Sequence, residues 1–470
     1  MEKVTQRKMV TMAMLVSIFL VAIDTTIVTT AMPHIVQQLN GLNLISWVFA
    51  IYLLTTSVTT PIYGKLADLF GRKPIFIIGV MLFVVGSMIS GTAQTMIQLI
   101  IFRAFQGLGA GAVTPLTFTI IGDLYSGEDR AKMQGVFSSI WGIAGLLGPL
   151  VGGLFVDQFS WRWIFYINVP IGIIAILLVH SFLHETQVKK EKKKIDYWGT
   201  IHFTLSMGSL LFALISGGEF YPWNSAVILS LFTTAFIFLI LFLYVETKAA
   251  EPMLPLSLFK IPVIAISNIV GFLASSVLIG VDVYLPIWIQ TLLGYSATSS
   301  GLTLMPMSFA WPLAATLAGR FMYKIGSKAT AVFGAVLITA GSGWLLLVHL
   351  SSPYWYFVGL MIVIGFGMGF SLTPLTVLIQ SAVGWSLRGA ATASNTFFRS
   401  LGQTVGIAIL GTAFNSSLST SIQHGVEMQN AMAQSMHLIF ILIVAISIVN
   451  LMISFILPSH REVMAQQKSD

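Results

Sequence analysis

Long apolar segments, separated by short polar ones, recur from one end of the chain to the other. A helix that crosses the hydrocarbon core of a bilayer needs about 20 predominantly apolar residues. Fourteen segments satisfy this requirement, with approximate limits 9–33, 43–64, 74–92, 96–121, 133–156, 163–184, 197–216, 224–245, 261–290, 298–319, 329–350, 354–380, 389–415 and 435–457. Only 9% of the 470 residues are charged and the mean hydropathy is +0.88, so the chain cannot cover a water-soluble surface. The sequence therefore predicts an all-α integral membrane protein with fourteen spans, and it excludes a soluble enzyme, a disordered chain and a nucleic-acid-binding protein.

The lysine and arginine residues predict the orientation of these spans. Cytoplasmic loops carry an excess of Lys and Arg. With fourteen spans and a cytoplasmic N-terminus, 21 of the 24 basic residues lie in cytoplasmic segments, Arg162 lies outside, and Arg103 and Arg399 lie within spans. Both termini are therefore expected in the cytoplasm. The basic run 189–194 is expected to be a solvated linker, with contact to anionic lipid as the alternative.

Two loops of similar sequence indicate an internal repeat. Residues 64–73 and 319–328 carry glycines and flanking basic residues at equivalent positions, at an offset of 255. Six spans precede the central linker and six begin at residue 261, whereas the spans between 197 and 245 have no counterpart. We expect three parts, which are an N-terminal six-helix bundle (1–184), a cytoplasmic linker with two extra transmembrane helices (185–260) and a C-terminal six-helix bundle (261–470). Parallel halves around a central substrate site are a plan of transporters.

Asp24 is an acidic residue inside the first apolar segment. A carboxylate there costs roughly 2.5–3.5 kcal/mol on insertion scales, so it usually faces a cavity or a partner. At about 1.5 Å per residue, Asp24 lies about 21 Å along a helix that starts near Val10, and Arg103 lies roughly 10 Å from the outer end of the fourth span. The two charges are therefore expected at similar depth, where they can pair. Such a carboxylate could alternate between protonated and ionised forms, and a static ion pair is the structural alternative.

Asp282 is the only other acid within a predicted span. It lies in the outer part of segment 261–290. It is a candidate second proton site or a charge that attracts cations, and an exposed carboxylate at headgroup level is the equally weighted alternative.

The loop at 64–73 combines small residues with charges. Gly64 and Gly71 permit a tight turn and close helix approach. Asp68 can accept hydrogen bonds from the amides of a helix N-terminus, where negative charge is favoured. Arg72 and Lys73 also act as topology signals, so Asp68 is the principal candidate for a gating residue.

The fifth span contains Gly148, Pro149, Gly152 and Gly153. These residues remove side-chain bulk and one backbone donor, which predicts a kink and tight packing at the interface of the two halves. Ordinary helix packing is the simpler alternative.

Polar and aromatic side chains within the spans are candidates for a substrate cavity. Asn395 and Arg399 share one face of the thirteenth span with Gln403, which favours a position inside the bundle. The further candidates are Thr25, Gln106, Trp141 and Trp288. A role in helix packing is the alternative for each of them.

Several chemical classes find no support in the sequence. It has no cysteine, no phosphate-binding loop and no His-Glu-x-x-His metal motif. No combination of nucleophile and base is visible either. We therefore expect a protein that is not an enzyme and that uses no metal or organic cofactor.

At this point the chain resembles a known family. The loop 64–73, the segment Arg103–Gly109, the segment Gly148–Gly153 and the segment Asp24–Pro33 resemble four signatures of fourteen-span EmrB/QacA-type drug:proton antiporters of the major facilitator superfamily. The resemblance covers nearly the whole chain. It implies a major facilitator fold, a contact of Asp68 with the start of the thirteenth span near Arg388, and export by exchange through the Gly148–Gly153 signature.

The function that follows is proton-coupled multidrug efflux across a bacterial plasma membrane. Hydrophobic or cationic compounds would leave in exchange for protons, with Asp24, Arg103 and Asp282 in proton coupling. The proton gradient would supply the energy, and the chain would work as a monomer in the lipid bilayer. The alternatives are an exporter of an endogenous metabolite, a lipid or a single antibiotic, a membrane sensor that transports nothing, and a membrane enzyme.

Overall fold

A computed structural model gives the fold of the chain and describes residues 5–39, 44–185, 195–218, 220–295 and 297–458. These residues form helices with one isolated β-bridge, between Gly217 and Tyr221, and no strand. The basic run 189–194 lies outside the described residues. The helices are α1 (Arg7–Leu39), α2 (Ile45–Phe70), α3 (Arg72–Gly91), α4 (Met96–Leu124), α5 (Gly127–Gln158), α6 (Trp163–Tyr166), α7 (Asn168–Phe182), α8 (Tyr197–Ser216), α9 (Ala226–Lys248), α10 (Ser257–Lys260), α11 (Pro262–Ile287, continued as a π-helical turn to Leu292), α12 (Ala297–Lys324), α13 (Ser327–Leu345), α14 (Tyr354–Ser381), α15 (Arg388–Gln423) and α16 (Met428–Ser454).

The number of spans differs from the sequence prediction. Among the described residues, twelve helices are long and apolar enough to cross a membrane. The long helices α2 and α5 are not among them, so the expected count of fourteen is not supported. Both helices contain residues that lie outside the described part of the chain, and the count covers the described residues alone.

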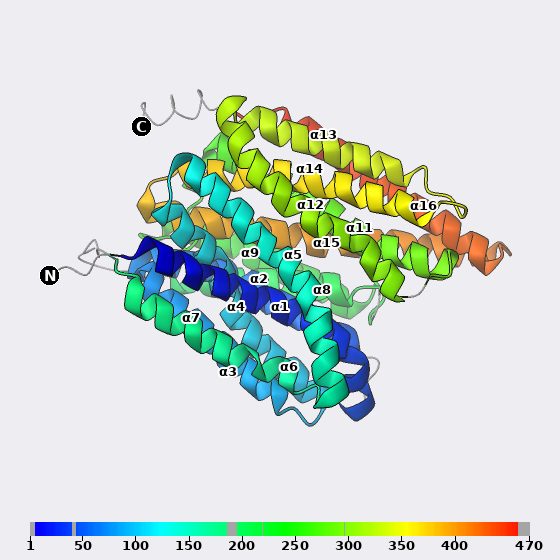
Figure 1. The fold of residues 1–470 in the computed structure, drawn as a ribbon, viewed down its shortest axis with the longest axis horizontal. Coiled ribbons are helices and arrows are strands. Elements are labelled where there is room, and N and C mark those ends of the chain that lie inside the picture. The colour runs from blue at the N-terminus through cyan, green and yellow to red at the C-terminus, as the bar shows by residue number, and fades with distance from the viewer. Residues whose placement is uncertain (1–4, 40–43, 186–194, 219, 296, 459–470) are drawn as a thin grey trace.

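The remaining long helices form two halves that repeat one packing scheme. In the first half α1 packs on α5, and α2 and α3 pack on α4; in the second half α11 packs on α15, and α12 and α13 pack on α14. Figure 1 shows the blue and cyan first half below the yellow and red second half. The repeated loops share a backbone conformation that favours glycine, with φ 99° and ψ 154° at Gly71 and φ 93° and ψ 153° at Gly326. The sequence offset of 255 is therefore also a structural repeat.

Two equivalent contacts join the halves, α2 with α15 and α5 with α12. Glycine lets the backbones approach closely at both. A methyl group on Gly64 would collide with Ala393, and one on Gly142 would collide with the backbone oxygen of Ser308. Small residues at these seams therefore set the spacing between the halves.

The pair α8 and α9 lies beside the α2–α15 seam. The ring of Phe203 in α8 packs 5.3 Å from Phe242 in α9 and 5.4 Å from Phe397 in α15, measured between ring centroids. The outer face of α9 is exposed and apolar, with Phe236 and Tyr244 uncovered. This pair sits outside the repeated scheme, and the exact boundaries of the three predicted parts stay a prediction.

Candidate functional site

A buried polar cluster surrounds Asp24 in the first half. Helix α1 supplies Asp24, α4 supplies Arg103 and Gln106, and α7 supplies Asn168, and all four side chains are inaccessible or nearly so. Arg103 Nη1 donates to Asp24 Oδ2 at 2.6 Å. Gln106 Nε2 and Asn168 Nδ2 donate to Asp24 Oδ1 at 2.9 and 2.8 Å. The carboxylate thus accepts three hydrogen bonds, one of them from a cation.

A second layer of contacts holds these donors in place. Arg103 Nη1 also donates to Gln106 Oε1 at 2.8 Å, and its guanidinium lies 4.1 Å from the ring centroid of Tyr52 in α2. Asn168 Nδ2 also donates to Ser87 of α3 at 3.0 Å. The cluster therefore ties five helices of the first half together. Removing one partner from a buried ion pair costs about 3–5 kcal/mol, because the other charge is left uncompensated.

The predicted pair of Asp24 and Arg103 is present in the structure, because both helices bring their charge to the same depth. Gln106, a cavity candidate, joins the pair one helical turn along α4. Thr25 does not, since its hydroxyl donates to the backbone oxygen of Val21 in its own helix. Sequence reasoning missed Asn168 as a site residue. Asn168 and Asp24 are 144 residues apart in the chain, so no local spacing connects them.

The loop between α2 and α3 makes the second charged cluster, at the end of the bundle that carries most of the Lys and Arg residues. We call this the basic end. Asp68 accepts hydrogen bonds from the backbone N–H groups of Gly389 at 3.0 Å and Ala390 at 2.7 Å. Both groups belong to the first turn of α15, where amides lack helical partners and the helix dipole favours an anion. The contact near Arg388 that the family resemblance implies is therefore present.

Arg72 connects Asp68 with further residues of both halves. It lies 2.7 Å from Asp68 and 3.2 Å from Asp123 of α4, and it donates to the backbone oxygen of Trp385 at 2.8 Å. Its guanidinium also lies 4.1 Å from the ring centroid of Trp385. Arg388 of the second half reaches the same Asp123 at 2.5 Å. Ionic contacts therefore cross between the halves at this end.

Glu185 caps the start of α3 next to this network. Its carboxylate accepts from the backbone N–H groups of Arg72 at 2.9 Å and Lys73 at 3.2 Å. Burial raises the pKa of Glu185, and these two hydrogen bonds lower that pKa in part. Lys73 itself donates to the backbone oxygen of His180. The sequence did not identify Glu185, Asp123 or Trp385, because no motif places them near the loop.

Together these contacts close the basic end in the structure. Gly64 brings α2 against α15, Asp68 binds the α15 N-terminus, and Asp123 joins Arg72 to Arg388. Lys65 adds an ion pair of 2.9 Å with Glu251, which follows α9. The inserted helices are thus tied to the same loop.

The glycine-rich segment of α5 packs differently from the sequence prediction. Gly148 faces α1 within its own half, where a methyl group would lie 2.7 Å from Thr26 Cβ. The close approach between the halves instead involves Gly135 and Gly142, which contact α12 at Thr316 and Ser308. Gly152 is buried, nothing lies within 4 Å of a methyl group placed on Gly153, and the side chain of Pro149 lies outside the described part. The kink predicted at Pro149 stays a prediction.

The other predicted site residues lie apart from Asp24. Asp282 is in α11 of the second half, and its buried Oδ1 has no hydrogen-bond partner among the described residues. Asn395 donates to Asn268 at 3.2 Å, and Arg399 is half-buried on the same helix. Trp288, a cavity candidate with helix packing as its alternative, is 1% exposed and packs 5.6 Å from Phe440 in the apolar core. Trp141 on α5 is exposed, so it is not enclosed in a buried site.

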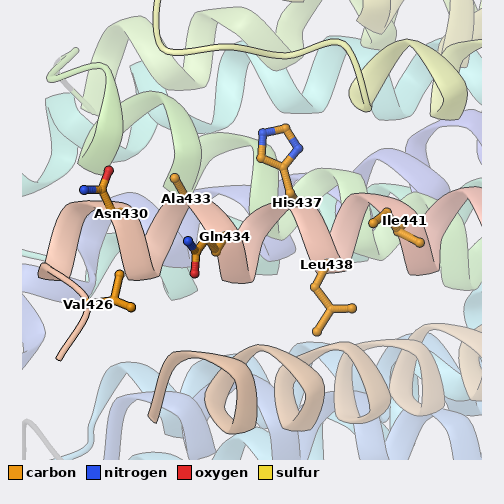
Figure 2. A pocket seen from close by; sticks show the side chains of 7 residues that line it. All are labelled: Val426, Asn430, Ala433, Gln434, His437, Leu438 and Ile441. Carbon is orange, nitrogen blue, oxygen red and sulfur yellow. The ribbon is translucent and has the colours of Figure 1, made fainter. Parts of the chain in front are cut away.

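A shallow recess of about 510 Å³ follows the face of α16. Figure 2 shows its lining, which begins at Val426 just before α16 and continues along that helix past His437 to Ile441. It belongs to the second half and includes none of the predicted site residues. No group of His, Asp and Glu side chains that could hold a metal ion occurs in the part of the chain that the structure describes.

Comparison with known proteins supplies the wider context. Residues 14–196 and 190–407 match the profile of the Major Facilitator Superfamily. The chain is 39% identical over 415 residues to the multidrug transporter protein MdtP of Bacillus subtilis (strain 168), covering 88% of this chain and 76% of that protein. It is also 39% identical over 414 residues to multidrug resistance protein 3 of the same organism, covering 87% and 80%.

Two solved structures share the fold. The human organic anion transporter MFSD10 superposes with a TM-score of 0.70 at 12% identity, covering 96% of this chain and 99% of that one. The proton:xylose symporter XylE gives a TM-score of 0.64 at 16% identity, covering 96% of each chain. At such low identity these two structures support the fold alone.

Proposed function

The chain belongs to the major facilitator superfamily and is a transporter, not an enzyme, and we propose that it is a proton-coupled antiporter that exports hydrophobic or cationic drugs. The buried, triply hydrogen-bonded carboxylate of Asp24 is the observation that carries this proposal. Similarity to two multidrug proteins of Bacillus subtilis supports efflux and a bacterial plasma membrane as the location.

Asp24 is the proposed proton-coupling residue. In the structure its charge is balanced by Arg103 and by two side-chain amides. Protonation would remove the charge that Arg103 faces and would leave Arg103 stacked on Tyr52 without a carboxylate partner. Because five helices meet at this cluster, a change of protonation can alter their packing. Asp282 is the proposed second proton site or cation-attracting charge, since its buried oxygen lacks a partner.

Asp68 and its loop are the proposed gate at the basic end. We propose that this end faces the cytoplasm, with both termini there, and that the structure represents the state closed to the cytoplasm. Opening would separate α2 from α15, so Asp68 would leave the N-terminal amides of α15. Rocking of the two halves would then alternate access to a central site.

We also propose that α2 and α5 cross the membrane with the twelve apolar helices, which gives the fourteen spans of the EmrB/QacA type. Each packs between helices that qualify as spans, α2 between α4 and α15, and α5 between α1 and α12. The proton gradient would drive the cycle without a bound cofactor, and a single chain would suffice. Export of one endogenous metabolite, lipid or antibiotic is the second candidate, and a sensor is the third.

Efflux from everted membrane vesicles tests the proposal. Vesicles that contain the wild-type chain should accumulate a fluorescent lipophilic cation when the interior is acidified, and collapse of the pH gradient should release it. Asp24→Asn keeps the size and most hydrogen bonds of the side chain but cannot ionise, so gradient-driven accumulation should fall to the level of empty vesicles. Full pH-gradient-dependent transport by this variant would refute the coupling role. A panel of chemically unrelated substrates separates multidrug efflux from export of a single compound.

A further inference from the structure

Arg399 is a half-buried cation within a membrane span, and it has no partner among the residues that the structure describes. The other buried arginines have partners: Arg72 pairs with Asp68 and Asp123, Arg103 with Asp24, and Arg130 with backbone and hydroxyl oxygens. Arg399 makes no hydrogen bond or ion pair with any residue that the structure describes. A charged residue within a span is costly and usually pairs or faces a cavity, so an uncompensated one indicates a ligand.

Arg399 lies about a third of the way along α15, counted from the basic end. It follows Arg388, the first residue of α15, by eleven residues, which corresponds to about 16 Å at the helical rise. Its aliphatic part lies against Gly271 of α11, where a methyl group would come within 3.2 Å of Arg399 Cγ. Asp282 is eleven residues beyond Gly271 on the same helix, again about 16 Å away. Asp282, the acid of the neighbouring helix, therefore lies too far along α11 to pair with Arg399.

The face of α15 that carries Arg399 is polar and is directed between the halves. Thr392, Thr396, Arg399 and Gln403 follow a spacing of four, three and four residues, so they form one stripe along the helix. Residues on other faces have assigned neighbours: Ser400 contacts Ser57 of α2, and Gly402 contacts Phe272 of α11. Thr392 receives a hydrogen bond from Gln380 of α14, and α15 also touches α4 of the other half. The stripe thus lies between α11 and the first half, and the Arg399 side chain keeps partial exposure.

We infer that Arg399 is a substrate-binding residue for a carboxylate group. A guanidinium offers a planar pair of N–H donors that matches a carboxylate in a bidentate geometry. A single cation without a second basic residue beside it suits a monoanion better than a phosphate dianion. The inference rests on the proposed export function and extends its substrates to amphipathic compounds that carry one carboxylate, including zwitterions.

A matched pair of dyes tests this inference. Rhodamine 110 carries a free carboxylate, and rhodamine 123 is its methyl ester, so the two differ only at the group that Arg399 would bind. Uptake of each dye into everted vesicles at one fixed pH gradient should be measured for the wild type, Arg399→Gln, Arg399→Lys and the control Lys260→Gln. Lys260 is an exposed basic residue of the same half.

Arg399→Gln should lower the initial rate for rhodamine 110 by about tenfold or more while the rate for rhodamine 123 stays within about twofold, since only the free acid loses charge-assisted hydrogen bonds. Arg399→Lys should restore part of the rate, and Lys260→Gln should match the wild type with both dyes. In detergent, rhodamine 110 should raise the unfolding temperature of the wild type but not of Arg399→Gln.

Three results would overturn the inference. They are an equal loss of rate for both dyes in Arg399→Gln, no loss of rate for either dye in that variant, and no transport of rhodamine 110 by the wild type. Failure of the wild type to move either dye would instead refute the proposed export function. Retained rhodamine 123 transport by Arg399→Gln shows that the variant is folded, so the two failures remain distinguishable.

Discussion

Replacement of Asp68 by asparagine should shift the protein away from the state that is closed at the basic end. The Asp68 carboxylate accepts two backbone N–H bonds from α15, at 3.0 and 2.7 Å, and it is 2.7 Å from Arg72. An asparagine keeps one acceptor oxygen, and its NH₂ group faces the second backbone N–H instead of accepting from it. The two contacts to α15 cross between the halves, so their loss weakens the closed state and leaves the open state unaffected.

The expected size follows from the contacts that remain. A hydrogen bond to a charged group contributes about 1.5–3 kcal/mol. Losing one and weakening the other therefore costs the closed state about 2–4 kcal/mol. The lower half of that range is the better expectation, because Arg72 retains Asp123 at 3.2 Å and is not left without a partner. A cost of about 2–3 kcal/mol changes the ratio of closed to open molecules by roughly 30- to 150-fold.

Spin-label distances measure this shift directly, since the chain contains no cysteine and labels can be placed cleanly. Ser126→Cys in the first half and Lys324→Cys in the second are exposed positions at the basic end. The doubly labelled protein should give one short distance with Asp68 intact and a substantial longer population with Asp68→Asn.

Asp129→Asn is the matched control for this measurement. Asp129 is an exposed acid at the same end whose ion pair with Arg7, at 3.6 Å, stays within one half. Such a surface pair contributes little, so the control should leave the distances unchanged. An Asp68→Asn variant with the wild-type distance distribution, or a control that opens equally, would refute the reasoning.

Two further predictions concern packing and pH. Gly142→Ala should destabilise the protein by about 1–3 kcal/mol, because the new methyl group collides with the backbone oxygen of Ser308. Gly145→Ala should destabilise the protein much less, since its methyl group would lie 3.9 Å from Ser308 Oγ. Equal losses of thermal stability in detergent for the two variants would contradict this account of the α5–α12 contact. Glu185 has a pKa raised by burial above its usual 4.5. The folded protein therefore binds this proton more tightly than the unfolded chain, and its contribution to stability falls as pH rises from about 4.5 through the raised pKa. Glu185→Gln should flatten that part of the profile of unfolding temperature against pH, and an unchanged profile would exclude the effect.

The sequence determined those features that depend on distance along a single helix. Apolar segments of sufficient length specified a helical membrane protein, and the offset of 255 between two loops specified the repeat that Gly71 and Gly326 display. The constant rise of a helix also placed Asp24 and Arg103 at one depth, so their pairing could be predicted.

The tertiary structure alone decided which helix each residue faces. Gly148 and Gly142 lie in one helix and look alike in the sequence, but the first packs on α1 and the second on α12. Trp288 was a candidate for a cavity with packing as the alternative, and its contact with Phe440 of α16 places it in the apolar core. Asn168 and Asp123 reach their partners from other helices, Glu185 does so from the segment after α7, and Arg399 has no partner among the described residues. Helical periodicity fixes the angle and depth of a side chain on its own helix, whereas its neighbours depend on how separate helices pack. That packing cannot be predicted from a short stretch of sequence.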